Sequence, residues 1–154
     1  MTVRIVQGDL LEQQVEVIVN AWNRNIIPWW LLLPQGVSGA IKRKAGLSPF
    51  QELSRMGPIP LGQAVHTGAG TLPFQGIIHV AGINMLWQSS EFSVRQSVQN
   101  ALRVADSKGY RSIAFPLIGA GSGNGNAARI ERWMLEEFAN STYSGDILLV
   151  KYRR

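Results

Sequence analysis

An apolar run that stops in a glycine-rich segment constrains the fold of this chain more than any other feature. Residues 113–125 have the sequence Ile-Ala-Phe-Pro-Leu-Ile-Gly-Ala-Gly-Ser-Gly-Asn-Gly. Glycine tolerates positive φ angles and leaves backbone N–H groups open to a ligand. A helical pattern follows, and N–H groups between a strand and a helix N-terminus favour phosphate. Taken alone, the segment fits either a phosphate-binding loop or a flexible turn.

The composition indicates one domain covering residues 1–154. The length is close to the ~150 residues typical of a domain, and a hydrophobic content of 45% is enough for a full core. No run of ~20 apolar residues could span a bilayer, and the start of the chain lacks the features of a signal peptide. The chain has no cysteine, which excludes disulfides and thiolate metal sites. We expect a cytoplasmic protein.

The charge balance favours an anionic partner. Fifteen Lys and Arg residues against ten Asp and Glu residues give a formal net charge of +5. The basic side chains are scattered, apart from a short run at Lys42, Arg43 and Lys44 and a few at the C-terminal end. The run suits the negative end of a helix dipole. Without a basic stripe interleaved with aromatics, we expect no sequence-specific nucleic-acid binding.

Hydrophobic periodicity predicts an α/β fold, with a mixed sheet of about six strands and helices on both faces. The expected strands cover residues 2–7, 15–19, 63–67, 76–80, 111–115 and 147–152. The expected helices cover residues 35–46, 49–56, 90–108 and 126–140. Gly109 is expected to end the third of these helices in a left-handed conformation.

Three polar or glycine-rich segments follow predicted strands. They are Asp9, residues 20–25 (Asn-Ala-Trp-Asn-Arg-Asn) and residues 119–125. The asparagines alone fit either ordinary turn residues or the side-chain amides of a site. In sheets of this kind ligands bind beyond the carboxyl ends of the strands. The convergence of three such segments therefore predicts a binding site there.

Two other features have alternative interpretations. Residues 26–34 (Ile-Ile-Pro-Trp-Trp-Leu-Leu-Leu-Pro) are bracketed by prolines and predict a surface flap folded onto the core. A lid or a partner surface is the alternative for this segment. His66 and His79 lie in strand-like runs without acidic or cysteine partners at metal-ligand spacing. We expect both to be hydrogen-bonded structural histidines, and we expect no metal site.

Taken together, several segments resemble the macro domain family. They are Gly8-Asp9-Leu10, residues 17–23 (Val-Ile-Val-Asn-Ala-Trp-Asn), Gly36-Val37, residues 77–82 (Ile-Ile-His-Val-Ala-Gly) and residues 115–121 (Phe-Pro-Leu-Ile-Gly-Ala-Gly). Their order is that of the family, and they cover essentially the whole chain. The resemblance implies a three-layer α/β/α sandwich that binds ADP-ribose.

The resemblance also implies which residues contact the ligand. Asp9 would accept a hydrogen bond from the adenine amino group, accompanied by the backbone at Leu10. Asn23 would contact the distal ribose, and Asn20 and Ala21 belong to the same segment. The other implied ligand-binding residues form a helix start and the loop whose backbone would wrap the diphosphate: Gly36, Val37, Ser38, Ile118, Gly119, Ala120, Gly121, Ser122, Gly123 and Asn124.

Two functions follow from the resemblance, and neither requires a cofactor. The first is hydrolysis of mono-ADP-ribosyl adducts or of O-acetyl-ADP-ribose, with Asn23 orienting the water. In one hydrolytic class an aspartate after the Gly-Val pair helps to position this water. Ser38 stands there in this chain; its hydroxyl can orient water but carries no charge. The alternative is a non-catalytic ADP-ribose reader or sensor.

Overall fold

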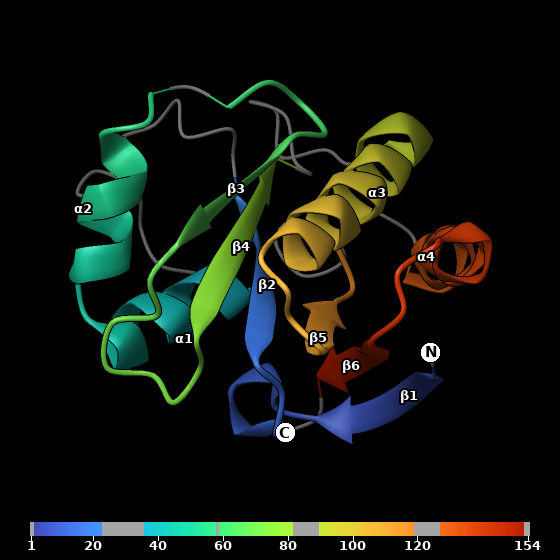
Figure 1. Cartoon of the computed structure of the whole chain (residues 1–154), viewed down its shortest axis with the longest axis horizontal. Helices are drawn as coiled ribbons and strands as arrows, with labels where there is room; N and C mark the ends of the chain where they lie inside the picture. Colours follow the sequence, from blue (N-terminus) through green and yellow to red (C-terminus); the bar gives the residue numbers. More distant parts are fainter. Residues whose placement is uncertain (1, 23–35, 58, 82–89, 119–126, 153–154) are drawn as a thin grey trace.

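The structure is a computed structural model that describes residues 2–22, 36–57, 59–81, 90–118 and 127–152 (Figure 1). The strands are β1 (Val3–Gly8), β2 (Val17–Trp22), β3 (Ala64–Thr67), β4 (Gly76–Ala81), β5 (Ser112–Pro116) and β6 (Asp146–Tyr152). The helices are the short 3-10 helix η1 (Leu10–Glu12), α1 (Gly36–Ala45), α2 (Ser48–Ser54), α3 (Glu91–Ser107) and α4 (Ala127–Asn140).

The strands form one mixed sheet in the order β1-β6-β5-β2-β4-β3. Five of these strands are mutually parallel: β1, β6, β5, β2 and β4. Strand β3, at the edge beside β4, runs antiparallel to them. Such parallel strands need crossover connections, and helices α3 and α4 lie in two of them. The expected α/β fold with a six-stranded mixed sheet is therefore confirmed.

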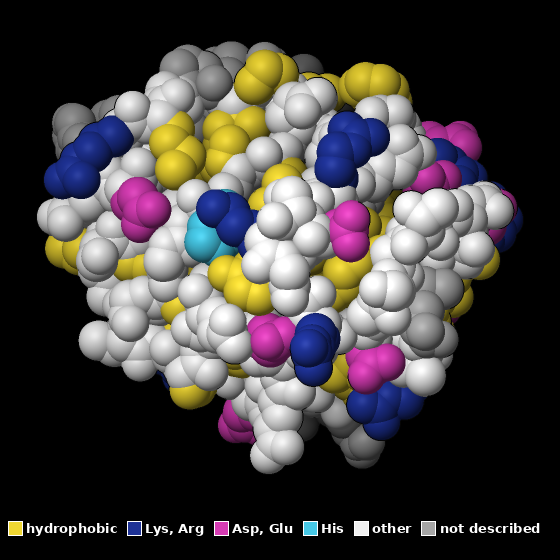
Figure 2. All heavy atoms as spheres, viewed as in Figure 1, with side chains coloured by type: hydrophobic (Ala, Val, Ile, Leu, Met, Phe, Trp, Pro, Cys, Tyr) yellow, Lys and Arg dark blue, Asp and Glu magenta, His cyan; other side chains and the backbone are white. Residues whose placement is uncertain are grey.

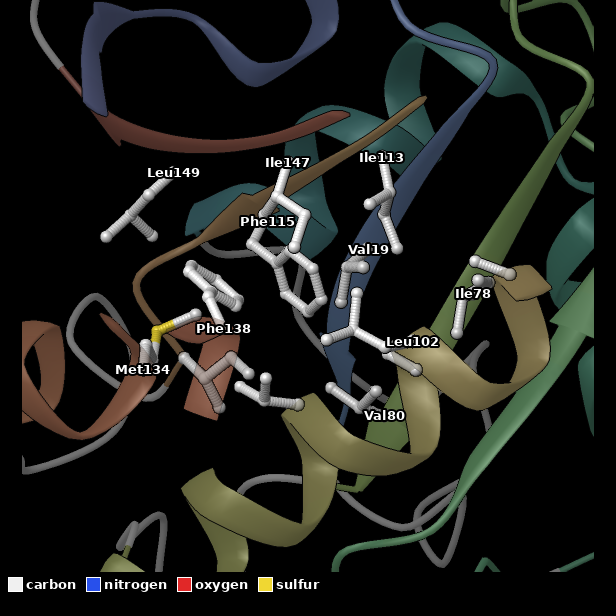
Figure 3. Close-up of a cluster of buried hydrophobic side chains, with 14 of the residues drawn as sticks. Val19, Ile78, Val80, Leu102, Ile113, Phe115, Met134, Phe138, Ile147 and Leu149 are labelled. Carbon is white, nitrogen blue, oxygen red and sulfur yellow. The ribbon is translucent and has the colours of Figure 1, made fainter. Parts of the chain in front are cut away.

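Helices cover both faces of this sheet (Figure 1). Because side chains alternate along a strand, neighbouring residues of β2 enter different cores. Val17 and Val19 join a cluster with residues of α3 and α4, while Ile18 joins a second cluster with η1, α1 and α2. Figure 3 shows the first cluster, where Phe115 of β5 and Phe138 of α4 have ring centroids 5.0 Å apart.

The strand boundaries differ from the expected ones by at most two residues, except at the end of β2, where the difference is largest. Strand β2 was expected to end at Val19 but continues to Trp22, pairing Asn20, Ala21 and Trp22 with the last three residues of β4. The sequence pattern is misleading there because a polar Asn20 resembles the start of a turn. Its side chain is hydrogen-bonded inside the sheet, so the strand continues through it. Gly109, which follows the C-cap residue Lys108 of α3, has φ +74, as expected.

Candidate functional site

The parallel strands bring distant segments of the chain to one edge of the sheet. Gly8 at the end of β1 lies opposite Tyr152 of β6, and Pro116 at the end of β5 lies opposite Val150. Strands β2 and β4 run in the same direction and end at Trp22 and Ala81. The ends of these strands therefore lie along one edge, the carboxyl edge, where open α/β sheets bind ligands.

Asp9 occupies a fixed position at this edge, as the N-cap residue of η1. Its carboxylate oxygen Oδ1 accepts a hydrogen bond from the backbone N–H of Leu11 at 2.9 Å. Its carbonyl accepts from Nε2 of Gln13, also at 2.9 Å. Leu10 is buried in the core cluster that also contains residues of α1 and α2, and η1 contacts β5 and β6. The cap and this buried leucine fix the turn that presents Asp9.

Helix α1 directs its N-terminus toward the same edge. The other end of the helix is held at the opposite edge, because Thr71 in the turn between β3 and β4 binds its last residues. The backbone N–H of Thr71 donates to the carbonyl of Ala45 at 3.1 Å, and its hydroxyl donates to that of Lys44 at 2.6 Å. Gly36 therefore begins the helix near the carboxyl edge. Backbone N–H groups at a helix start favour an anion such as phosphate.

Asn20 lies inside β2, and its side chain is fully buried. Its amide nitrogen Nδ2 lies 3.0 Å from Nδ1 of His79, the residue opposite it on β4. Ala21, the next residue, is half-buried and packs against the core shared with α3 and α4. The contacts of Asn20 and Ala21 with a ligand remain predictions.

His79 is a structural histidine, as the sequence indicates. Its second ring nitrogen Nε2 lies 2.8 Å from the hydroxyl of Thr67, and the ring of Phe50 packs edge-on against it. Burial disfavours the charged imidazolium and lowers the pKa of His79 to about 3, with a smaller contribution from His66. The ring is therefore neutral at physiological pH.

His66 is also a structural histidine, and its hydrogen-bond partner is Tyr110. Its Nε2 lies 2.7 Å from the hydroxyl of Tyr110, with the two rings stacked. Burial, and then the positive charge of Lys108, lower the pKa of His66. Within the described ranges, no three His, Cys, Asp or Glu side chains gather in a way that could hold a metal ion.

Some of the predicted site falls outside the described residues. This holds for Asn23, for residues 119–124 of the glycine loop and for the Trp29-Trp30 segment. Of the loop segment, Ile118 is described, and its side chain is completely buried just after β5. Of the remaining predicted residues, Val37 and Ser38 lie in the first turn of α1. Of the predicted site, the structure thus brings Asp9, Leu10, Ile118 and the first turn of α1 to one edge.

Sequence inspection missed the link between His79 and Thr67. These residues are twelve positions apart on β4 and β3, and only the antiparallel pairing of those strands brings them together. The alternation of side chains between the two faces of the sheet was a possible signal, but it does not identify which residue bonds to which.

The surface charges on one face of the molecule follow the pattern expected from the sequence. On the face shown in Figure 2, basic and acidic side chains are interspersed, without a block of one sign.

Comparisons with known proteins agree with this architecture. The family model described as Macro domain matches residues 19–134. A protein of Escherichia fergusonii named O-acetyl-ADP-ribose deacetylase is 39% identical, over 77% of this chain and 68% of its own. A macro domain-containing protein of Listeria monocytogenes is 36% identical, over 99% of this chain and 89% of its own.

Solved structures give the same result. A mutant macrodomain of Oceanobacillus iheyensis with ADPR has a TM-score of 0.84 and 27% identity, covering 96% of this chain and 83% of its own. A Trypanosoma brucei macrodomain in complex with ADP-ribose has a TM-score of 0.80 at 23% identity, over 99% of this chain and 64% of its own. No helix in the described part of the chain is long and apolar enough to cross a membrane.

Proposed function

The chain belongs to the macro domain family, and from this premise we propose that it binds ADP-ribose at the carboxyl edge of its sheet. We propose further that it hydrolyses mono-ADP-ribosyl adducts or O-acetyl-ADP-ribose. The observation that carries the proposal is the meeting of Asp9 and the start of α1 at one edge. Relatives named for ADP-ribose chemistry, or solved with this ligand, support the same choice.

The proposal assigns each part of ADP-ribose a counterpart among the residues predicted for this site. The carboxylate of Asp9 is an acceptor for the amino group of adenine, and its charge strengthens such a bond. One oxygen of this carboxylate already caps η1, which fixes the orientation of the group. The backbone of residues 119–124 and the N–H groups at the start of α1 provide donors for the diphosphate. Asn23, beyond the end of β2, serves the distal ribose.

Hydrolysis requires a water molecule held against the distal ribose or its acyl group. In this proposal the amide of Asn23 orients the water, and a phosphate of the substrate accepts the proton. Ser38 in the first turn of α1 can hydrogen-bond to the same water, but its hydroxyl does not act as a base at neutral pH. Catalysis therefore depends chiefly on how the water molecule is positioned, without a protein base, and we expect turnover to be slow.

Catalysis is tested by incubating the purified protein with mono-ADP-ribosylated protein and, separately, with O-acetyl-ADP-ribose. Released ADP-ribose or acetate is measured over time and compared with an Asn23→Ala variant. Release that depends on Asn23 supports the hydrolase. Equal release from both proteins, or none from either, would leave no role for Asn23 in catalysis.

A non-catalytic ADP-ribose reader is the second candidate. The observation that favours it is Ser38, which stands where a hydrolytic class has an aspartate. A reader would bind ADP-ribose as tightly as the proposed enzyme but release no product in the same assay. A Ser38→Asp variant tests the reader further. If the wild type fails to turn over only because it lacks a carboxylate at this position, the variant should release product.

A further inference from the structure

A buried polar network crosses the sheet next to the candidate site. It contains the side chains of Asn20, His79 and Thr67, which belong to three adjacent strands and are all completely buried. Around it, β2 and β4 are apolar: Val17, Ile18 and Val19 precede Asn20, and Ile77 and Ile78 precede His79. The network therefore interrupts a continuous hydrophobic region near the carboxyl ends of both strands.

The direction of each hydrogen bond follows from its chemistry. The Thr67 hydroxyl donates its one proton to the carbonyl of Gly68 at 2.9 Å, so it accepts from Nε2–H of His79. A neutral imidazole with its proton on Nε2 has a bare Nδ1, which accepts from the amide nitrogen of Asn20. The bond to Thr67 and the bond to Asn20 thus require the same tautomer of His79. Both ring nitrogens of His79 are therefore satisfied in one tautomer.

Such a network adds specificity that an apolar pair would not. Hydrophobic side chains in these positions could fill the same volume, whereas hydrogen bonds hold only when donor and acceptor lie opposite each other. Asn20 and His79 are register partners, so their bond fixes β2 relative to β4 at the fourth residue of each strand. Only Ala21 and Trp22 follow Asn20 before β2 ends at the carboxyl edge.

We propose that His79 is a positioning residue for ADP-ribose binding: through Asn20 it holds the carboxyl end of β2, from which the ligand-binding segment continues. This inference rests on the proposed function. His79 itself lies within the sheet, and Asn20 carries its effect. Loss of the bond to Asn20 should therefore weaken ligand binding, and loss of the bond to Thr67, on the side away from β2, should do so much less.

Two substitutions separate the two hydrogen bonds of His79. In His79→Asn, the side-chain oxygen takes the place of Nδ1 and still accepts from Asn20, while the donor to Thr67 is lost. In His79→Gln, the longer side chain carries its amide nitrogen toward the place of Nε2 and keeps that donor, while Asn20 loses its acceptor. Each variant lacks one buried hydrogen bond. We expect them to lose similar stability but to differ in ligand affinity.

The control removes a hydrogen bond at the other edge of the sheet. Tyr143 donates to the carbonyl of Tyr110 at 2.6 Å, at the amino end of β5, away from the candidate site. Tyr143→Phe should lower stability and leave the affinity for ADP-ribose unchanged. It shows how much of any change in affinity comes from loss of stability alone.

The readouts are the ADP-ribose Kd from calorimetry and the hydrogen-exchange rates of the Ala21 and Trp22 amides without ligand. We expect His79→Gln to raise Kd about tenfold, as for one lost hydrogen bond, and to speed exchange at both amides. His79→Asn and Tyr143→Phe should stay within about threefold of the wild type in Kd.

Several outcomes would overturn the inference. One is that both His79 variants keep the Kd and the exchange rates of the wild type, which would make His79 a core residue only. Another is that both variants weaken binding equally, because the bond to Asn20 would then have no special role. If the wild type itself failed to bind ADP-ribose, the proposed function would be wrong, and the exchange rates alone would show whether His79 holds the end of β2.

Discussion

Lowering the pH should destabilise this protein through the buried ring of His79. Its ring nitrogens bind Asn20 and Thr67, so a second ring proton would replace the acceptor that Asn20 needs. Burial, the larger cause, and the charge of His66 lower the pKa of His79 from 6.5 to about 3. Unfolding exposes the ring to water and restores its ordinary pKa.

The sign and size of the effect follow from these two pKa values. Between about 6.5 and 3 the unfolded chain binds a proton at His79 and the folded chain does not. Protons therefore favour the unfolded state in this window, and the stabilisation present above pH 6.5 is lost as the pH falls. One group contributes about 1.4 kcal/mol per pH unit, so the free energy of unfolding should drop by about 2 kcal/mol at pH 5.

Urea unfolding at pH 7.5 and pH 5.0 measures this loss, and His79→Asn is the matched control. Asparagine does not titrate but can still accept the hydrogen bond from Asn20, and the variant keeps every other titratable group of the wild type. The wild type should lose about 2 kcal/mol more than the variant between the two pH values. An equal loss in both proteins would refute a neutral, buried His79. His79→Gln provides the same comparison if the asparagine variant does not fold.

Three further substitutions test other parts of the structure. Asp9→Asn should keep the cap of η1 but weaken ADP-ribose binding by about 1–3 kcal/mol in calorimetry, whereas Asp9→Ala should lose stability as well. An unchanged Kd in Asp9→Asn would remove this carboxylate from the site. Gly76→Ala should destabilise the protein by about 1–3 kcal/mol in thermal or urea unfolding, because its methyl group would collide with the ring of His66 and approach the Tyr110 hydroxyl to 2.7 Å; wild-type stability would mean that these rings move aside easily. Gly121→Val should block the diphosphate without unfolding the protein, and normal ADP-ribose affinity would exclude this loop as the phosphate cradle.

The fold was largely predictable because strands and helices leave regular patterns. Strand β4 is a continuous buried run, and α3 repeats its apolar residues every three or four positions. Ser90 also forms a capping box with Ser93 at the start of α3. The strand and helix periodicities are local, so the sequence alone indicates them, whereas the capping box was not predicted. The macro domain resemblance then supplied the three-layer arrangement.

The parts that were missed depend on contacts between distant residues. Asn20 was expected to follow a strand because a cluster of asparagines after an apolar run is typical of turns. Its actual place inside β2 depends on His79, which is 59 positions away in the chain. Thr67 was not singled out, since its role exists only when β3 pairs with β4. Polar residues in a central strand can be interpreted only with their partners.

The candidate site was predictable to the extent that parallel strands share a carboxyl edge. Asp9 follows β1 directly, and its place at this edge follows from the direction of the strand. Its cap to Leu11 could not be predicted, because the same residue also fits a simple turn. The roles of Asn23 and residues 119–124 remain predictions.

The most direct test of the account is a calorimetric titration of the protein with ADP-ribose, compared with AMP, ADP and NAD. The account predicts that ADP-ribose binds tightest, because it alone joins adenine, diphosphate and a free distal ribose. AMP should bind weakest, since it lacks the second phosphate and the distal ribose. An absence of binding, or equal affinity for AMP and ADP-ribose, would contradict the assignment of this edge as an ADP-ribose site.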